Sequence, residues 1–185
     1  RSPFHTEFIS KNFDGEKRRQ ARLLKKFLKA TGIYGAEIST GGLSGYVSEV
    51  LVHKYGSFEN VLNAAADWQP RQVVAVGDYD MDVVKGFNSP IIIIDPVDVR
   101  RNLGTAISPE SAGRFMLAAR AFLARPSIQF FNLLEGGMAV LTLSDTFCVD
   151  RNREDFLELI RSKAIGYGTP SPVRNARRKS RHIPL

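Results

Sequence analysis

The sequence has little cysteine and no long apolar run, and both shortages exclude classes of protein. Its single cysteine, Cys148, excludes an internal disulfide framework and a cysteine-based zinc site. The isoleucine run Ile91–Ile94 is far shorter than the roughly 20 residues that a membrane-spanning helix needs. No secretory signal opens the chain, and Arg1 is not an initiator methionine. We therefore expect a cytoplasmic protein in a reducing compartment, from which something upstream of Arg1 has been removed.

Acidic residues are also in deficit. The chain has 26 Lys and Arg against 19 Asp and Glu, which gives a net charge of +7 and a pI near 9.8. Such a balance favours polyanionic partners such as nucleic acid or nucleotide phosphates, although a basic protein from a highly charged proteome would look the same. With 185 residues and 43% hydrophobic residues, there is room for one domain with a real core plus an appendage.

Apolar residues recur at helical spacing in four stretches, each with a plausible start or stop signal. One begins near Glu16 and ends at Gly32, and a second begins near Ser44 and ends at Gly56. The other two are capped by Ser57 and by Ser108, and they end before Pro70 and Pro126. A helical bundle would bury these stripes, so we predict a mainly α fold with minor β structure.

Between and around these helices the expected structure is irregular. We expect residues 1–12 to be extended, because Pro3 restricts the residue before it. Residues 73–76 and 91–94 are predicted strands, and 77–86 an exposed loop rich in Asp. After Phe131 we expect a short α/β extension over 132–170 and a disordered tail over 171–185 with five basic residues and no acidic one.

Five motifs together carry a family resemblance. They read RSPFH at 1–5, RLLKKFLK followed by GIYGAE over 22–37, LSGY at 43–46, YGSF at 55–58 and DPVDVRRN at 95–102. In this order they closely resemble the second, central domain of archaeal (class I) CCA-adding enzymes, whose runs read approximately RTPFH, RLLKxFLK, GxYGAE, FSGYxxELL, YGSF and DPVDxxRN. The resemblance covers residues 1–131, and several long matches in order are far more specific than one short motif.

The resemblance implies a fold, an activity and a set of site residues. The fold would be a helical substrate-binding domain similar to that of poly(A) polymerases. The enzymes restore the 3′-terminal CCA of tRNA from CTP and ATP without a template. By motif, their triphosphate contacts fall on His5, Lys25 and Tyr34, and their nucleotide-selecting arginine falls on Arg101. Weaker expected contacts to tRNA or phosphate are Ser44, Tyr46, Arg22 and Lys26.

These residue types suit the expected ligands, because imidazole, ammonium and phenol all donate hydrogen bonds to phosphate oxygen and a planar guanidinium suits a base edge or a phosphate. Each assignment also has a structural alternative. His5 could be a capped loop residue, Lys25 part of a solvated helix face, and Tyr34 a core residue. Arg101 could instead pair with an aspartate of its own turn.

Five further positions bear on the resemblance. Asp95 and Asp98 are read as structural residues that order the turn by local hydrogen bonds. The sequence also departs from the family pattern at Gly41, where a basic residue is common, and at Leu43, which replaces an aromatic; the family glutamate is kept as Glu49. The change at Gly41 puts one contact to nucleotide or RNA in doubt.

Nucleotidyl transfer needs carboxylates that hold metal ions. In this family a head domain, which precedes the RxPFH run, supplies the carboxylates for Mg²⁺, so we expect no catalytic residue in this chain and no activity of the chain alone. The implied partners are the tRNA 3′ end, ATP or CTP, and a head domain in the same or a separate chain; a homodimer stays open, and no membrane is involved.

Three alternatives remain. The chain could be a stand-alone RNA- or nucleotide-binding module, or one subunit of a split enzyme. It could also be a metal enzyme that uses Asp78, Asp80 and Asp82, but a calcium loop would need glycine and glutamate where Val83 and Ser89 stand. An acidic surface loop is the better interpretation of the three aspartates.

Overall fold

Five of the α-helices begin after a residue whose side chain accepts a hydrogen bond from the backbone N–H three residues further on. The computed structural model describes residues 2–132. Ser2, Asp14, Ser44, Ser57 and Ser108 each precede a helix and accept a hydrogen bond from the backbone N–H three residues further on, which the first turn would otherwise leave without a partner. The elements are α1 (Pro3–Asn12), α2 (Gly15–Ala30), α3 (Gly45–Tyr55), α4 (Phe58–Ala66), β1 (Gln72–Val74), α5 (Met81–Lys85), β2 (Ile91–Ile93), η1 (Leu103–Ala106), α6 (Pro109–Ala124) and η2 (Ile128–Phe131).

Helices α2, α3, α4 and α6 and both strands confirm the sequence-based prediction, but α1 corrects it. Residues 1–12 are predicted to be extended, whereas Pro3–Asn12 forms a helix. Pro3 does restrict Ser2, which is extended at φ −72° and ψ 155°. That restriction ends at the cap, because proline at the first helical position has a suitable φ and lacks an N–H that would have no partner there.

The Asp-rich stretch also differs from its prediction. Asp78, Asp80 and Asp82 are exposed as expected, yet the stretch contains the short helix α5 rather than a continuous loop. The Asp80 carboxylate caps α5 by accepting from the backbone N–H of Asp82, and the Asp82 carboxylate pairs with Lys85 at 2.7 Å.

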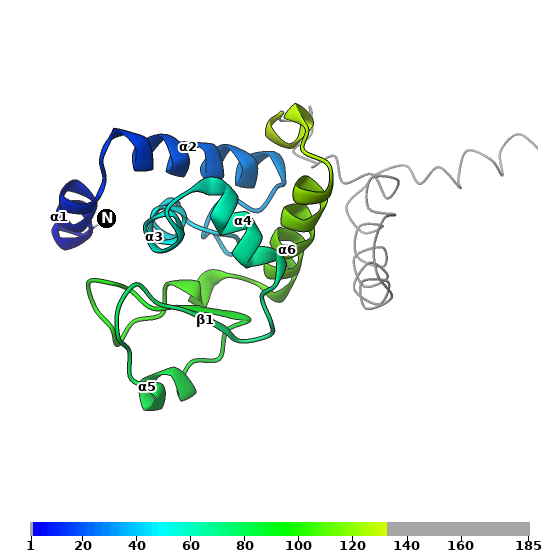
Figure 1. Ribbon diagram of the computed structural model, residues 1–185. Coiled ribbons are helices and arrows are strands. Elements are labelled where there is room, and N and C mark those ends of the chain that lie inside the picture. The colour runs from blue at the N-terminus through cyan, green and yellow to red at the C-terminus, as the bar shows by residue number, and fades with distance from the viewer. Residues whose placement is uncertain (1, 133–185) are drawn as a thin grey trace, which may run out of the picture. The chain divides into compact units, whose positions relative to one another are not determined.

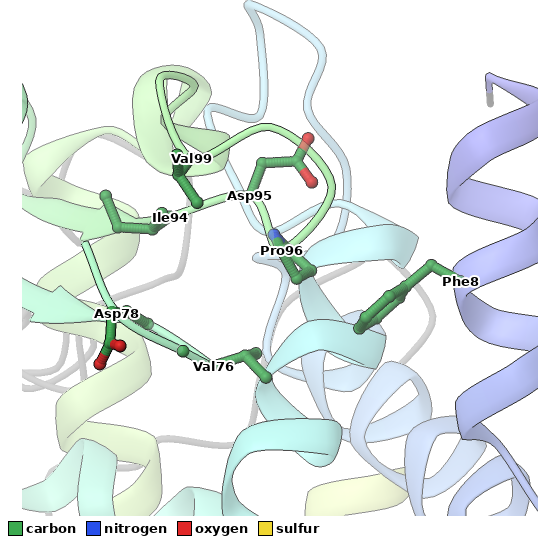
Figure 2. Close-up of a pocket in the computed structure, with 9 residues that line it drawn as sticks. Phe8, Val76, Asp78, Ile94, Asp95, Pro96 and Val99 are labelled. Atoms are coloured by element: carbon green, nitrogen blue, oxygen red, sulfur yellow. The ribbon is translucent and has the colours of Figure 1, made fainter. Parts of the chain in front are cut away.

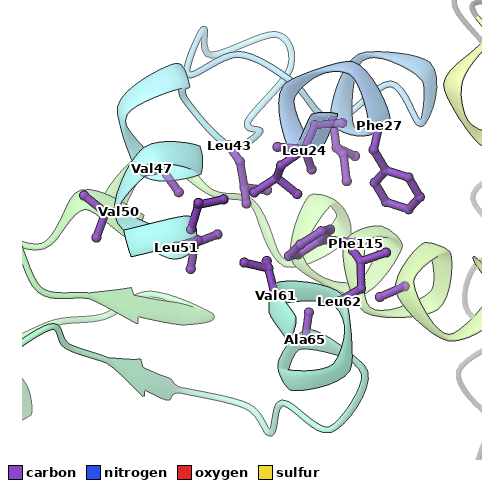
Figure 3. Packing of buried hydrophobic residues seen from close by; sticks show 14 of the residues in the cluster. Leu24, Phe27, Leu43, Val47, Val50, Leu51, Val61, Leu62, Ala65 and Phe115 are labelled. Carbon is purple, nitrogen blue, oxygen red and sulfur yellow. The ribbon is translucent and has the colours of Figure 1, made fainter. Parts of the chain in front are cut away.

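The main core lies between α2, α3, α4 and α6 (Figures 1 and 3). Phe27 of α2 is fully buried, and its ring packs edge-on against Phe58 and Phe122 with centroids 5.6 and 5.8 Å apart. Helix α3 lies between α2 and the strands, and every residue from Tyr46 to Val52 is buried. This helix therefore has fixed neighbours on all sides over two turns.

The strands β1 and β2 form a small parallel sheet in which Gln72, Val73 and Val74 pair with Ile91, Ile92 and Ile93. Ile91 and Ile93 face the main core, whereas Ile92 and Ile94 pack with Ala75 and Val84 in a second cluster. Because successive side chains of a strand point to opposite faces, both faces of β2 are buried. This explains a continuous β-branched run where a half-exposed strand would alternate.

The predicted extension over 132–170 lies outside the described residues except for Asn132, and so do the predicted tail 171–185 and Cys148. Within residues 2–132, no helix combines the length and the apolar character that crossing a membrane would require.

Helix α1 is attached to α3 through an aromatic contact that contains an ionisable ring. His53 of α3 lies 5.2 Å from the Phe8 ring and 6.0 Å from the Phe13 ring, measured between centroids. Burial lowers the pKa of His53 below its ordinary 6.5, and the positive charge of Lys17 lowers it further. The unfolded chain therefore binds more protons than the folded chain between that lowered pKa and 6.5.

We expect the free energy of unfolding to fall as the pH drops from 7.5 through 6.5 and towards the lowered pKa of His53. His53→Phe keeps an aromatic ring between Phe8 and Phe13 but cannot titrate, so this variant should lose part of that pH dependence. Urea unfolding at pH 7.5, 6.5 and 5.5 measures both slopes. Equal slopes in the two proteins would contradict the assignment to His53.

Candidate functional site

The first two turns of α3 are where four of the eight predicted site residues meet. Ser44 is its N-cap, and no acidic residue lies in its first turn. Tyr46 and Glu49 are both buried and stand three residues apart, so they are neighbours on one side of the helix. Through these two side chains α3 contacts His5 and Lys25. The N-terminal half of α3 is therefore the common support of the site.

His5 is held by a carboxylate and an aromatic ring that come from distant parts of the chain. Its Nε2 lies 2.9 Å from Oδ2 of Asp95, and its ring stacks on Tyr46 with centroids 4.3 Å apart. The Tyr46 hydroxyl donates to Oδ1 of the same carboxylate at 3.4 Å. The three side chains form one contact group, in which Asp95 is 0% exposed and the His5 side chain 11%. His5 is thus a positioned helix residue, not a loop residue.

The same carboxylate also orders the loop that follows β2. Oδ1 of Asp95 accepts from the backbone N–H of Val97 at 3.0 Å, and Asp98 accepts from Arg100 at 3.1 Å. These bonds confirm the interpretation of both aspartates as turn-ordering residues. The contact of Asp95 with His5 is additional, and sequence reasoning missed it.

Arg101 has a fixed backbone and an exposed side chain. Its carbonyl accepts from the backbone N–H of Asp95 at 3.0 Å, and its own N–H donates to the carbonyl of Asp98 at 2.9 Å. In the part of the chain that the structure describes, its guanidinium forms no ion pair with either aspartate, since Asp95 pairs with His5 instead. Its side chain is therefore available to a ligand.

Asn102 anchors the end of this loop from inside. Its Oδ1 accepts from the backbone N–H groups of Ile93 and Gly104 at 2.9 and 2.8 Å, and its Nδ2 donates to Oγ of Ser89 at 2.9 Å. Asn102 is 6% exposed, so water cannot replace these bonds easily. Arg101 is thus held between two buried polar residues, Asp95 and Asn102.

Lys25 reaches α3 from α2. Its Nζ donates to Oε1 of Glu49 at 2.6 Å, and the two side chains are 22% and 9% exposed. Lys25 is therefore not part of a freely solvated face. Arg22 and Lys26 are exposed neighbours on the same helix, with Arg22 one turn before both.

Tyr34 follows α2 in a loop that folds back on itself. The backbone of Tyr34 pairs with that of Leu43 in an isolated parallel β-bridge. The ammonium of Lys29 lies 5.0 Å from the centroid of the Tyr34 ring. The ring is half-buried against the main core. Tyr34 therefore combines a core contact with a partly accessible surface beside the start of α3.

This arrangement can be compared with known proteins. The family profile described as "tRNA nucleotidyltransferase, second domain" matches residues 19–132, which is more than half of the chain. The chain belongs to this family.

Curated relatives of this second domain are CCA-adding enzymes of archaea. The chain is 45% identical over 132 residues to that of Pyrobaculum neutrophilum, 44% over 131 to that of Sulfurisphaera tokodaii and 39% over 131 to that of Methanothermobacter thermautotrophicus. Each match covers 71% of this chain but only 31%, 31% and 28% of the relative. The chain thus spans less than a third of the length of these relatives. The resemblance to the archaeal-type second domain is confirmed.

Gly41, where the family pattern has a basic residue, lies in a backbone conformation and in a space that suit glycine. Gly41 has a φ of +51°, which suits glycine, and a side chain there would meet Cβ of Ser108 at 2.9 Å. Its carbonyl accepts from the backbone N–H of Ser108 at 2.7 Å, and Ser111 donates to the carbonyl of Thr40 at 3.1 Å. The loop is therefore fastened to the start of α6 where the family pattern has a basic residue.

A hollow of about 200 Å³ lies beside Asp95, where both strands end (Figure 2). Its lining is mostly apolar and includes Phe8 of α1, Val76 after β1, and Pro96 and Val99 after β2. The carboxyl ends of parallel strands often border ligand sites. Here the hollow separates α1 from the strand ends next to the His5 contact.

The domain brings together His5, Tyr46, Lys25 and Ser44 at one end of α3, and Arg101 joins them through the Asp95 loop. Arg22 and Lys26 lie apart on the exposed side of α2. Sequence reasoning gave Asp95 and Glu49 no role toward His5 and Lys25. A usable signal was present, because a carboxylate that directly follows the buried run Ile91–Ile94 must find donors.

Replacing Asn102 should loosen the Arg101 loop. Asn102→Ala removes three hydrogen bonds and leaves the N–H groups of Ile93 and Gly104 buried without a partner. We expect the free energy of unfolding to fall by about 2–3 kcal/mol. Asn88→Ala, at an exposed position on the approach to β2, is the matched control and should change it by less than about 0.5 kcal/mol. Urea unfolding of both variants measures the difference, and similar losses would contradict an anchoring role.

Proposed function

We propose that this chain is the part of a CCA-adding enzyme that binds the triphosphate of ATP or CTP and helps to position the 3′ end of tRNA. The carrying observation is the placement of His5 and Lys25. Both project from different helices onto the N-terminal half of α3, and each is held by a buried carboxylate. Two positioned cationic or polar donors beside a helix N-terminus suit a polyanionic ligand.

Each proposed triphosphate contact has a donor to offer. The Lys25 ammonium carries three protons, of which one points to Glu49, so two remain for phosphate oxygens. Tyr34 is half-buried, so part of its side chain is accessible, and its hydroxyl can donate. His5 uses Nε2 for Asp95, so a phosphate contact falls to Nδ1.

The remaining predicted residues fit the nucleic acid side of the proposal. The exposed guanidinium of Arg101 can reach a base edge or an RNA phosphate. Arg22 and Lys26 extend the positive surface of α2 away from Lys25 and suit the tRNA backbone. Ser44 and Tyr46 already serve as N-cap and as support of His5, so any contact of theirs with tRNA or phosphate would be secondary.

The chemical step is assigned to another domain. The described residues contain no group of three or more His, Cys, Asp or Glu that could hold a metal ion. In nucleotidyl transfer, carboxylates hold the Mg²⁺ that stabilises the leaving pyrophosphate. We assign that metal and its carboxylates to a head domain, in the same or in a separate chain.

Removing the charge of Lys25 should weaken nucleotide binding. Lys25→Gln keeps an N–H donor for Glu49 but loses the positive charge. We therefore expect the Kd for ATP and CTP to rise about tenfold in a chain that still folds but is less stable. Calorimetry measures the affinity, and thermal unfolding checks the fold. Lys54→Gln, exposed in the last turn of α3, is the matched control. Equal effects of the two variants would contradict a triphosphate contact at Lys25.

Transfer itself should be absent from this chain alone. With labelled ATP, Mg²⁺ and a tRNA that ends in CC, we expect no incorporation of AMP. Incorporation would contradict the assignment of catalysis to a head domain, and Asp78, Asp80 and Asp82 would then be the first residues to replace. A separately expressed head domain that restores incorporation in the presence of this chain would support a division of labour between the two.

A further inference from the structure

Asp95 is placed where it can act on two of the proposed ligand residues at once. Its side chain contacts His5, and its backbone N–H holds the carbonyl of Arg101. Its carboxylate is fully buried and meets three donor groups, from His5, Tyr46 and Val97. The carboxylate thus joins α1, α3 and the 95–102 loop at one point.

The contact with the Asp95 carboxylate determines which ring nitrogen of a neutral His5 carries the proton. Oδ1 is occupied by the donors of Tyr46 and Val97, which leaves Oδ2 to the imidazole. A carboxylate oxygen accepts only, so the proton of a neutral His5 ring lies on Nε2. The other ring nitrogen, Nδ1, has no hydrogen-bond partner among the described residues and is not among their enclosed polar atoms, so it reaches solvent.

An accessible Nδ1 without a proton cannot donate to a phosphate oxygen. It becomes a donor when one proton from solvent binds to it, and the ring then carries a positive charge between the Asp95 carboxylate and the phosphate. Among residues 2–132, the titratable groups in contact with the ring are Asp95 after β2 and Tyr46 on α3.

We propose that Asp95 is a positioning residue of the site: it fixes His5 as an Nε2–H imidazole, so that a triphosphate binds at Nδ1 together with one proton. This inference rests on the proposed function, because it needs a triphosphate at His5. It adds a residue that does not touch the ligand and a proton that accompanies binding.

The substitution Asp95→Asn keeps the shape of the side chain but removes its negative charge and changes the tautomer of His5. The amide oxygen of Asn keeps the place of Oδ1, where two donors point, and its NH₂ group then faces His5. The imidazole must accept from that group with Nε2, so its proton moves to Nδ1. Asp98→Asn makes the same chemical change three residues away at an exposed position of the same loop and serves as the matched control.

Two measurements test the proposal. Nitrogen NMR of the imidazoles, with His5 assigned by His5→Gln, should show Nε2–H in the wild-type chain and in Asp98→Asn, and Nδ1–H in Asp95→Asn. Calorimetry of ATP binding without Mg²⁺, in buffers of different ionisation enthalpy at pH 7.5, should show uptake of up to about one proton more in the wild type than in His5→Gln. Asp95→Asn should lose this uptake. It should bind ATP about tenfold more weakly, because its neutral Nδ1–H donor replaces a positively charged one.

The outcomes distinguish this inference from the proposed function. Asp95→Asn combined with His5→Gln should bind no more weakly than His5→Gln alone, because Asp95 acts through His5. A neutral His5 with its proton on Nδ1 in the wild type would overturn the inference without any variant. So would an Asp95→Asn effect that persists undiminished in the His5→Gln background. If the wild-type chain does not bind ATP at all, the proposed function fails and the inference fails with it.

Discussion

Burying a carboxylate costs several kcal/mol unless close donors surround it, and this constraint shapes the end of the domain that carries the candidate site. Asp95 is fully buried, and its donors come from α1, α3 and the loop after β2. Those three segments must meet for the charge to be tolerated. The buried carboxylate of Glu49 on α3 likewise requires α2 to lie close by, because its partner Lys25 is on α2. Two buried negative charges thus place the two side chains that we assign to the triphosphate.

These buried contacts can fix the orientation of His5 and Lys25 only if the element that carries them is itself rigid. Helix α3 provides it, because its residues from Tyr46 to Val52 are buried among α2, α4 and the strands. The loop between α2 and α3 is fastened as well, by the bonds of its Gly41 and Thr40 carbonyls to the start of α6. Side chains on packed elements keep their orientation better than side chains on free loops, which is what positioning a ligand requires.

The charge distribution agrees with this division of tasks. Asp95 and Glu49 are buried and paired, whereas Arg22, Lys26, Lys29 and Arg101 are exposed. The two carboxylates that organise the site are therefore covered by the protein, whereas basic side chains of α2 and of the loop after β2 are exposed at its surface. In the proposed function, such a surface complements a head domain whose carboxylates hold the metal.

The sequence by itself determined the helices and the family. Apolar spacing and capping residues located α2, α3, α4 and α6, because these signals are local, and the motifs at 1–5, 22–37 and 95–102 identified the second domain. They also supplied His5, Lys25, Tyr34 and Arg101 as candidates. Local signals failed where two interpretations share one pattern: Ser2 and Pro3 suit an extended segment as well as a helix start, and the Asp-rich stretch suits a loop as well as α5.

Tertiary structure alone decided which side chains meet. His5 and Asp95 are 90 residues apart, and Lys25 and Glu49 are 24 apart. Nothing in the local sequence specifies such pairs, because they depend on how α1, α2 and β2 pack around α3. The isoleucine run before Asp95 required only that a buried carboxylate find donors somewhere. Packing selected His5 and Tyr46 for that role, since only a folded chain brings their donors within hydrogen-bond distance of a group that water cannot reach.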